Sequence, residues 1–479
     1  EAEMTNLVIN SNEGYGIRSE NTALTLNQGT IETLGRQSDA IWLSGDNSVA
    51  NIDDVELSAS GVRAHAVLQD GGSITLRNSE LQTSGIGGHV IESSNGVFNG
   101  DNLRINSSGA GGHGVLVGAD AVVTLTNSDI NTLGGGSAGI RVNSGGRLIG
   151  SGLGIDASGG SAVALQGGDL QLSESKLHAT GTTAVLDVQP ADDVRGQGRF
   201  DNVSFSSEQG ALIKATGGNA DLIFSGSGEL KSNGGGLLLD ATTPGTSDLT
   251  VQADNYQLAG DMHVGDNHRA AVTLSGESVW QGAASALTEL SLNNSRWLMT
   301  LSSTLGSLNL QNGRVNFGAA GADDFQTLTT DMLSGSGEFA MRTDIANLRG
   351  DRLQVTADGA SQGNHTLVVE DSGRAPQNGD DRLVLVDANG GDARFSLAGE
   401  HVDAGAFRYY LHEENSDWYL ATVTESVDPV DPADPDPITP VDPVDPVTPV
   451  VPIIPEDPQD PVAPARPDTR ANNLSKGAN

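Results

Sequence analysis

A pattern of residues that returns every 22 to 26 positions, from about residue 15 to 185, constrains the fold more than any other feature of this sequence. In each repeat a branched apolar residue follows a smaller one, at Gly16-Ile17, Ala40-Ile41, Ala66-Val67, Val90-Ile91, Gly114-Val115, Gly139-Ile140, Ala162-Val163 and Ala184-Val185. A second pattern has the order apolar, polar, small, any residue, glycine and keeps the same period, at Ile31–Gly35, Leu57–Gly61, Leu81–Gly85, Ile105–Gly109, Ile130–Gly134, Ile155–Gly159 and Leu177–Gly181. A fixed period of this length is typical of units that bury an apolar face only by stacking on their neighbours.

The second pattern predicts one strand of a parallel β-solenoid in each repeat. In Leu81-Gln82-Thr83 the first and third side chains share one face of the strand, and the polar side chain between them points to water. We expect the glycine that follows to form a sharp corner through a φ value that other residues avoid. A leucine-rich repeat has a similar period, but its L-x-x-L-x-L-x-x-N spacing is absent from this sequence.

Short polar residues recur three positions before the second pattern. They are Asp54, Asn78, Asn102 and Asn127, with Gln28 and Glu174 in the same register. Asn tolerates the left-handed backbone conformation, and its amide can donate a hydrogen bond to another Asn. We therefore predict a ladder of stacked polar side chains along one corner of the solenoid.

Three histidines occupy equivalent places in consecutive repeats. His65, His89 and His113 lie 24 residues apart, and Asp39 holds the same place one repeat earlier. Stacked strands are about 4.8 Å apart, so the imidazoles should form a column. One interpretation is a metal-binding strip or a pH sensor, because adjacent imidazolium ions repel one another. We favour a structural stack, because ligands in a flat column converge poorly on a metal; no cofactor is expected.

The formal net charge of −37 disfavours nucleic acid as a partner, since phosphates would be repelled. Five basic residues near the middle of the repeats are candidates for a local ligand-binding strip: Arg141, Arg147, Lys176, Arg195 and Arg199. The alternative, which we favour, is that these residues are scattered charges that keep the surface hydrated.

The composition changes along the chain and suggests four segments. Residues 1–285 are expected to form the solenoid, with regular turns at about 15–185 and turns with variable loops after that. Residues 286–424 are richer in aromatic residues and should hold the most stable core. Residues 425–468 hold 14 of the 17 prolines, many in Asp-Pro units, and are expected to be an extended polyproline II linker. Residues 469–479 form a short final segment.

Several motifs in the aromatic-rich segment resemble the C-terminal passenger region of pertactin-like autotransporters. They are Leu290–Trp297, Gly306–Leu310, Phe325–Leu328, Leu333–Gly337, Asp351–Val355, Leu367–Val369 and Asp403–Tyr409. The resemblance covers roughly 130 residues. It implies a right-handed, three-faced parallel β-helix, all-β, with a C-terminal β cap that acts as an autochaperone. It also implies an outer-membrane β-barrel after the passenger, and residues 469–479 resemble the lead-in to that barrel, so we expect the chain to stop near the passenger boundary.

The autochaperone that the resemblance implies is a folding and secretion nucleus in the C-terminal segment. Its candidate residues are the aromatic side chains Trp297, Phe339, Phe407, Tyr409 and Trp418. Folding of this segment would bias export through the outer membrane, and each further turn would then stack on a preformed template.

Motifs for enzymatic activity are largely absent from the sequence. The Gly-Asp-Ser-Gly motif of the secreted serine-protease branch does not occur, and the Arg-Ile-Lys and paired Asp motifs of polygalacturonases are missing around Gly112-His113-Gly114. We therefore predict no enzyme, with a β-helical polysaccharide hydrolase or lyase as the alternative. The tripeptide Arg349-Gly350-Asp351 matches the integrin-recognition motif, but a turn between two strands also explains it.

The sequence as a whole favours a non-catalytic adhesin on the surface of a Gram-negative bacterium, exported through the periplasm. The expected partner is a host cell-surface or matrix protein, a glycan, or the same passenger on another cell. The resemblance implies roles in attachment, aggregation or biofilm formation. Whether the passenger is released from the cell, and whether it binds a receptor or only itself, stay open.

Overall fold

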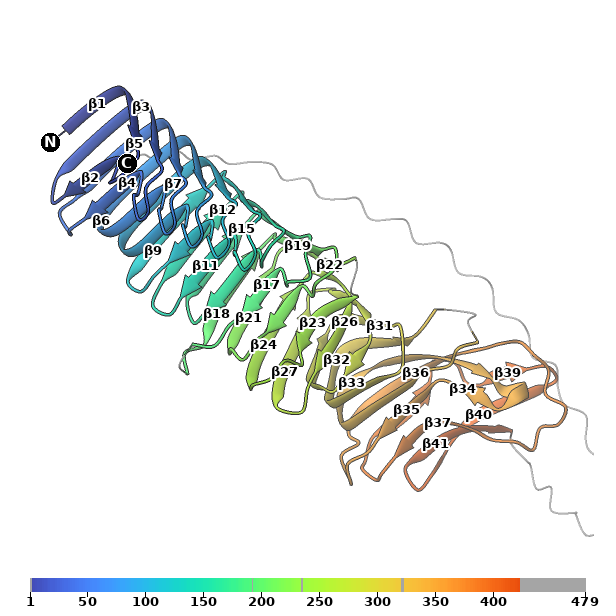
Figure 1. Ribbon diagram of the computed structural model, residues 1–479. Coiled ribbons are helices and arrows are strands. Elements are labelled where there is room, and N and C mark those ends of the chain that lie inside the picture. The colour runs from blue at the N-terminus through green and yellow to red at the C-terminus, as the bar shows by residue number, and fades with distance from the viewer. Residues whose placement is uncertain (1, 192, 234–235, 320–322, 423–479) are drawn as a thin grey trace, which may run out of the picture. The chain divides into compact units, whose positions relative to one another are not determined.

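The computed structural model describes residues 2–191, 193–233, 236–319 and 323–422. These residues belong to one compact unit that runs from Glu1 to Thr424. The predicted linker at 425–468 and the final segment at 469–479 lie outside the described residues. Figure 1 shows the described part as a stack of β coils, coloured from blue at its first strands to red at its last.

Each turn of the regular region has three strands, one on each of three parallel sheets, which we call faces A, B and C. Face A contains β2 (Ile17–Glu20), β4 (Ile41–Ser44), β8 (Val115–Val117), β11 (Ile140–Asn143), β14 (Val163–Gln166), β17 (Leu186–Val188), β20 (Ile213–Ala215), β23 (Leu237–Ala241), β26 (Asp261–Val264) and β29 (Ala284–Ser285). Face B contains β9 (Ala121–Thr126), β12 (Arg147–Ser151), β15 (Asp169–Ser173), β18 (Gly196–Asp201), β21 (Ala220–Ser225), β24 (Ser247–Asp254), β27 (His268–Ser275) and β30 (Leu287–Asn293). Face C contains β10 (Asp129–Thr132), β13 (Gly154–Ala157), β16 (Lys176–Ala179), β19 (Ser204–Ser207), β22 (Glu229–Ser232), β25 (Gln257–Ala259), β28 (Val279–Gly282) and β31 (Arg296–Met299).

Longer strands bend from one face to the next at both ends of this region. They are β1 (Ala2–Ser11), β3 (Ala23–Thr33), β5 (Val49–Ala59), β6 (Val67–Thr83), β7 (Ile91–Ser107), β32 (Ser303–Phe317) and β33 (Thr327–Asp344). The structure thus confirms the all-β parallel solenoid with three faces that the repeats and the resemblance predicted.

The core is a set of apolar columns inside the three sheets. The first residue of the second pattern is buried in every turn, at Ile31, Leu57, Leu81, Ile105, Ile130, Ile155 and Leu177, each no more than 1% exposed. Burial of such a side chain contributes about 1.5–3 kcal/mol, and each residue packs against its equivalents in the turns before and after it. The strand alternation predicted at Leu81-Gln82-Thr83 is confirmed, because the first and third residues are buried and Gln82 is partly exposed.

The corner between faces B and C carries the predicted polar ladder. Its residues adopt the left-handed conformation, with φ between 48° and 60°, at Gln28, Asp54, Asn78, Asn102, Asn127 and Glu174. The amide of Asn102 donates to Oδ1 of Asn78 over 2.9 Å, and Gln28 donates to Oδ2 of Asp54 over 3.1 Å. The ladder is therefore present in part, since Asn78 and Asn127 donate instead to Asp53 and Asp101. Backbone geometry explains the choice of residues.

The glycines that end the second pattern have a different role from the one predicted. Gly61, Gly85, Gly109, Gly134 and Gly159 do not adopt left-handed φ values. A Cβ atom at any of them would instead lie 1.8–2.2 Å from the carbonyl oxygen of the glycine one turn earlier. These glycines are needed because successive corners stack too closely for a side chain, so the predicted reason was wrong although the predicted corner is present.

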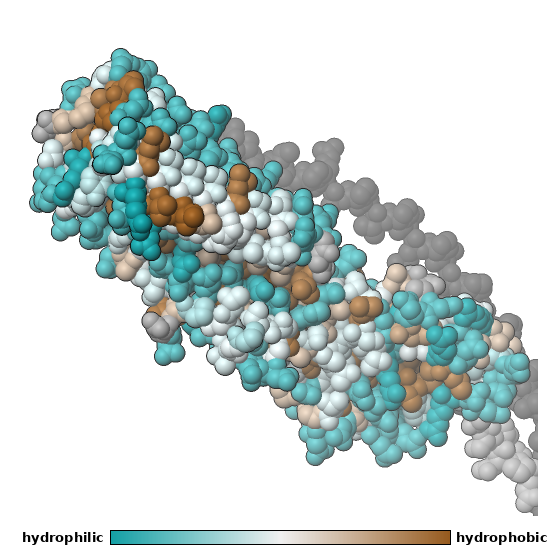
Figure 2. All heavy atoms as spheres, in the orientation of Figure 1, coloured by the Kyte–Doolittle hydropathy of each residue, from teal (hydrophilic) through white to brown (hydrophobic). Residues whose placement is uncertain are grey.

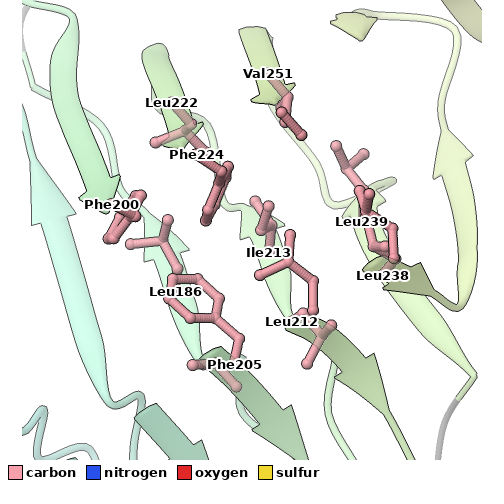
Figure 3. Packing of buried hydrophobic residues seen from close by; sticks show 14 of the residues in the cluster. Leu186, Phe200, Phe205, Leu212, Ile213, Leu222, Phe224, Leu238, Leu239 and Val251 are labelled. Carbon is pink, nitrogen blue, oxygen red and sulfur yellow. The ribbon is translucent and has the colours of Figure 1, made fainter. Parts of the chain in front are cut away.

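The buried aromatic core begins earlier than residue 286. Phe200, Phe205 and Phe224 pack together inside the coil, with the rings of Phe200 and Phe224 stacked 4.7 Å apart (Figure 3). Trp280 stacks on Trp297 with ring centroids 4.8 Å apart. The pairing of β28 with β31 carries the sheet across the expected boundary at 285/286 without a break.

The proposed nucleus residues are mostly interior. Trp297, Phe339 and Tyr409 are no more than 1% exposed, Trp418 is 9% exposed, and Phe407 is only partly buried. Their burial is compatible with a stable C-terminal core. Their role in folding order stays a prediction.

A C-terminal cap closes the stack with antiparallel strands. After β33 come the 3₁₀ turn η1 (Ile345–Asn347) and the strands β34 (Arg349–Gly350), β35 (Arg352–Val355), β36 (Asn364–Asp371), β37 (Leu383–Ala388), β38 (Arg394–Leu397), β39 (Val402–Ala404), β40 (Phe407–Glu414) and β41 (Asp417–Thr422). The strand β41 pairs antiparallel with both β37 and β40. Within the described residues, no helix has the length and apolarity needed to span a membrane.

Candidate functional site

The three histidines form the predicted column at the corner before face A. The ring centroids of His65 and His89 are 5.3 Å apart, and those of His89 and His113 are 4.8 Å apart. Each Nδ1 accepts a backbone N–H from the next turn: His65 from His89 at 3.0 Å, His89 from His113 at 2.9 Å, and His113 from Ala138 at 2.9 Å. Asp39 begins the series, since its Oδ1 accepts the N–H of His65 at 2.8 Å.

These hydrogen bonds make the column unsuitable for a metal ion. A neutral imidazole whose Nδ1 accepts a hydrogen bond carries its proton on Nε2. Neither nitrogen then offers a free lone pair, and a metal needs one. Among the described residues, no group of three or more His, Asp or Glu side chains is arranged to hold a metal. The column instead connects consecutive turns through their backbone amides, as the structural interpretation predicts.

Burial and neighbouring charges keep the rings of His89 and His113 neutral. Burial, followed by the charges of His113, His65 and Arg141, lowers the pKa of His89 to about 3. Burial and Arg141 lower the pKa of His113 to about 4. The carboxylate of Glu92 lies 3.4 Å from Nε2 of His65 and 3.9 Å from Nε2 of His89. In the folded protein these two rings therefore take up protons only well below pH 6.

The five basic candidates do not lie together. Arg141 is on β11 of face A, Arg147 and Arg199 are on face B, Lys176 is on β16 of face C, and Arg195 lies in the loop before β18. Their spacing in sequence suggested a strip, but the strand on which each residue falls decides its face.

Three of these arginines are also paired with carboxylates. Arg147 and Arg199 both contact Asp169, at 3.5 and 3.3 Å. Arg195 contacts Asp221 at 2.8 Å and Asp248 at 3.0 Å. The five residues are therefore scattered over three faces and a loop, and form no continuous strip in the described chain.

The integrin-like tripeptide is unavailable to a receptor. Asp351 is fully buried, and its carboxylate accepts hydrogen bonds from the guanidinium of Arg342 at 2.9 Å and from the backbone N–H of Gln326 at 2.7 Å. The tripeptide needs an exposed carboxylate for recognition. Arg349 and Gly350 form the short strand β34 where a turn was predicted, and the burial of Asp351 argues against recognition by a receptor.

A serine, a histidine and a glutamate meet on face C without forming a catalytic site. Ser206 Oγ lies 2.8 Å from Nδ1 of His178, and Nε2 of His178 lies 3.9 Å from Glu208. A hydrolase also needs N–H groups that stabilise an oxyanion. The strand β19, which carries Ser206, is paired on both sides with β16 and β22, so its backbone amides are committed to the sheet.

One surface groove offers carboxylates, but the three that line it are all exposed. It has a volume of about 640 Å³ and follows the polar ladder, where Glu56, Glu80 and Asp54 line it together with Arg104. Glycosidic cleavage requires one carboxyl group that stays protonated, usually through burial against an apolar wall. Glu56 and Glu80 are exposed on a polar surface, which disfavours the polysaccharide-hydrolase alternative.

Comparison with known proteins places the chain among autotransporters. Residues 305–422 match the family model described as Pertactin, which covers all of the motifs that suggested it except Leu290–Trp297. The chain is 30% identical over 399 residues to the BrkA autotransporter of Bordetella pertussis, covering 80% of this chain and 36% of that protein. It is 32% identical over 262 residues to the autotransporter adhesin/invasin TibA of Escherichia coli O78:H11, covering 51% of this chain and 25% of that protein.

The chain therefore spans about a third or less of the length of these curated relatives. Among solved structures, the autotransporter UpaB from E. coli strain CFT073 aligns with 88% of this chain and 99% of its own, at 15% identity and a TM-score of 0.40.

Proposed function

The chain is an autotransporter passenger domain with a pertactin-like C-terminal region, and from this premise we propose that it acts as a non-catalytic adhesin displayed on a Gram-negative cell. It would attach the bacterium to host cells or matrix, or to other bacteria in aggregates and biofilms. The observation that carries the proposal is the long stack of three polar faces. The corners carry closely stacked glycines and an exposed ladder of polar side chains, which repeat the same position of each turn along a line.

The exposed surface suits many weak contacts better than one catalytic cleft. In Figure 2 most of the visible surface of the described residues is hydrophilic or neutral, and hydrophobic residues lie in small separate groups. Face C carries a column of neutral side chains that includes Ser58, Gln82, Asn106 and Asn131, beside a groove of about 490 Å³. Such a column repeats hydrogen-bonding groups about every 4.8 Å.

Self-association is the second candidate, and this neutral column favours it. Two solenoids that lie side by side would exchange hydrogen bonds between these neutral side chains. Each contact is weak in water, but many copies on a cell surface raise the effective concentration and make the sum strong.

Display of the passenger on a strain that neither clumps nor adheres tests both candidates. Settling of the cells alone would indicate self-association. Binding only to wells coated with matrix proteins or glycans would indicate a receptor. The proposal is wrong if displayed cells do neither, and release of reducing ends from a polysaccharide would support the enzyme alternative.

A further inference from the structure

The C-terminal cap contains a trough, lined by both arginines and aspartates, that the repeat analysis did not predict. Two adjoining hollows, of about 550 and 440 Å³, share the side chain of Arg382. We call their combined lining the C-terminal trough: Asp324, Phe325, Leu348, Arg349, Gly350, Arg352, Gly379, Asp380, Arg382, Leu383, Val384, His412, Tyr419, Ala421 and Thr422. The strands that carry it include β35, β37 and β41, which lie near one another at the orange end of the stack (Figure 1).

Three guanidinium groups gather in the trough of a chain whose net charge is −37. Arg352 is paired with Asp387 and Arg382 with Glu414, each at 2.5 Å, while Arg349 donates to a backbone carbonyl. All three side chains are exposed or nearly half exposed, and such surface pairs contribute less than about 1 kcal/mol. Each guanidinium has five N–H donors, so donors remain for an incoming anion.

Aromatic rings support two of these arginines. The guanidinium carbon of Arg349 lies 5.1 Å from the ring centroid of Phe325, and that of Arg382 lies 4.9 Å from the ring centroid of Tyr419. The ring of Tyr419 stacks in turn on His412 at 5.7 Å. Stacking restricts where the guanidinium planes point, which lowers the entropy cost of binding a planar anion.

The rim of the trough contains a strained and exposed apolar residue. Leu348 adopts a left-handed φ of 53° and remains 44% exposed. A leucine rarely adopts this conformation, because its Cβ crowds the backbone. With Leu383 and Val384 on the floor, the trough combines an apolar surface with cations, as many ligand-binding sites do.

We propose that the C-terminal trough binds a carboxylate-bearing sugar chain. Guanidinium groups pair with planar carboxylates through two parallel hydrogen bonds. Asp324 and Asp380 supply acceptors for sugar hydroxyl groups, and the aromatic and aliphatic side chains cover the apolar face of a sugar ring. This ligand class deepens the proposed adhesive function and depends on it.

An extended peptide fits the trough less well. Peptides that bind along a sheet use unpaired backbone groups of an edge strand. Here β35 is paired with β33 and β37, while β41 is paired with β37 and β40. The trough therefore recognises ligands through side chains alone, which matches the carboxylates and hydroxyls of an acidic glycan.

Isothermal calorimetry with the full chain tests the assignment. The probes are sialyllactose and a hyaluronan hexasaccharide, which carry carboxylates in a terminal and an internal sugar respectively, and lactose as the neutral control. We expect one of the acidic sugars to bind at least tenfold more tightly than lactose. A triple variant, Arg349→Gln, Arg352→Gln and Arg382→Gln, should lose that preference, whereas the variant Arg147→Gln should keep it.

Three results would overturn the assignment: equal affinity for lactose, full affinity in the triple variant, or equal competition by a short poly-glutamate peptide. Circular dichroism of the triple variant, with an unchanged β spectrum, ensures that lost binding does not reflect unfolding. The same variant displayed on cells separates the two proposals. If cells that display the variant still adhere although glycan binding is lost, only the assignment of the trough is wrong. If wild-type cells neither adhere nor clump, the proposed adhesive function is wrong.

Discussion

The imidazole column makes the middle of the solenoid sensitive to acid, and the size of the effect follows from its geometry. His89 and His113 are neutral in the folded state, with pKa values of about 3 and 4. In the unfolded chain their pKa is about 6.5, so the unfolded state binds protons first as the pH falls. The stability that these rings contribute is therefore complete above pH 6.5 and declines below it.

The loss amounts to about 1.4 kcal/mol per pH unit for each ring. At pH 4.5, two units below the unfolded pKa, the two rings together cost about 5 kcal/mol. Protonation of the rings in the folded state does not restore this stability, because a protonated Nδ1 cannot accept the backbone N–H of the next turn. Turns that meet at His113 and Ala138 should therefore separate before the rest of the stack.

Hydrogen exchange monitored by mass spectrometry measures this opening. Peptides that cover residues 105–140 should lose protection between pH 7 and 4.5, after correction for the intrinsic pH dependence of exchange. A double variant, His89→Asn and His113→Asn, provides the control, because an Asn oxygen does not titrate and Asp39 shows that a side chain of this length reaches the next amide. The variant should keep its protection at pH 4.5.

Equal loss of protection in the wild type and in the double variant would refute this reasoning. Carboxylates elsewhere in this acidic chain also titrate in the same pH range. The decisive quantity is therefore the difference between the two proteins, which we expect to be several kcal/mol at pH 4.5 and near zero at pH 7.5.

The other predictions concern packing, the buried ion pair and folding order. Gly85→Ala should destabilise the protein by about 3 kcal/mol or more in urea unfolding, because its Cβ would lie 1.8 Å from a carbonyl oxygen, whereas Gly135→Ala meets open space and should have little effect. Asp351→Ala should cost about 3 kcal/mol or more, since it removes the buried partner of an arginine, and soluble RGD peptide should not compete with cell binding. Trp297→Ala should reduce surface display, measured by flow cytometry, more than Ile41→Ala does; equal display would count against a C-terminal folding nucleus.

The repeat made the solenoid predictable from sequence because each turn meets the same neighbours at the same distance. A corner that needs a left-handed residue needs it in every turn, so Asn78 and Asn102 reveal both the corner and its period. The column of His89 and His113 was predictable for the same reason. Periodicity does not show how close two backbones come, however, and the close approach at Gly85 was therefore attributed to φ.

The face on which a residue lies within its turn was harder to predict than the residues that stack on it in neighbouring turns. Arg147 and Lys176 seemed to belong to one basic cluster, but they lie on opposite sides of the corner between faces B and C, which Gly152 forms in one turn and Glu174 in the next, with φ of 66° and 48°. Likewise, Asp351 looked exposed in a turn because sequence does not show that Arg342, nine residues earlier, lies beside it.

A regular stack limits the kind of binding site that it can build. Each column presents one position of the repeat, so its side chains form a line and do not converge on a single ligand. Convergence needs strands that are not equivalent, and the antiparallel cap provides them: Arg349, Arg352 and Arg382 come from different strands and the loops beside them. We therefore expect the solenoid faces to supply many weak, similar contacts, and the place where the repeat ends to supply chemical selectivity.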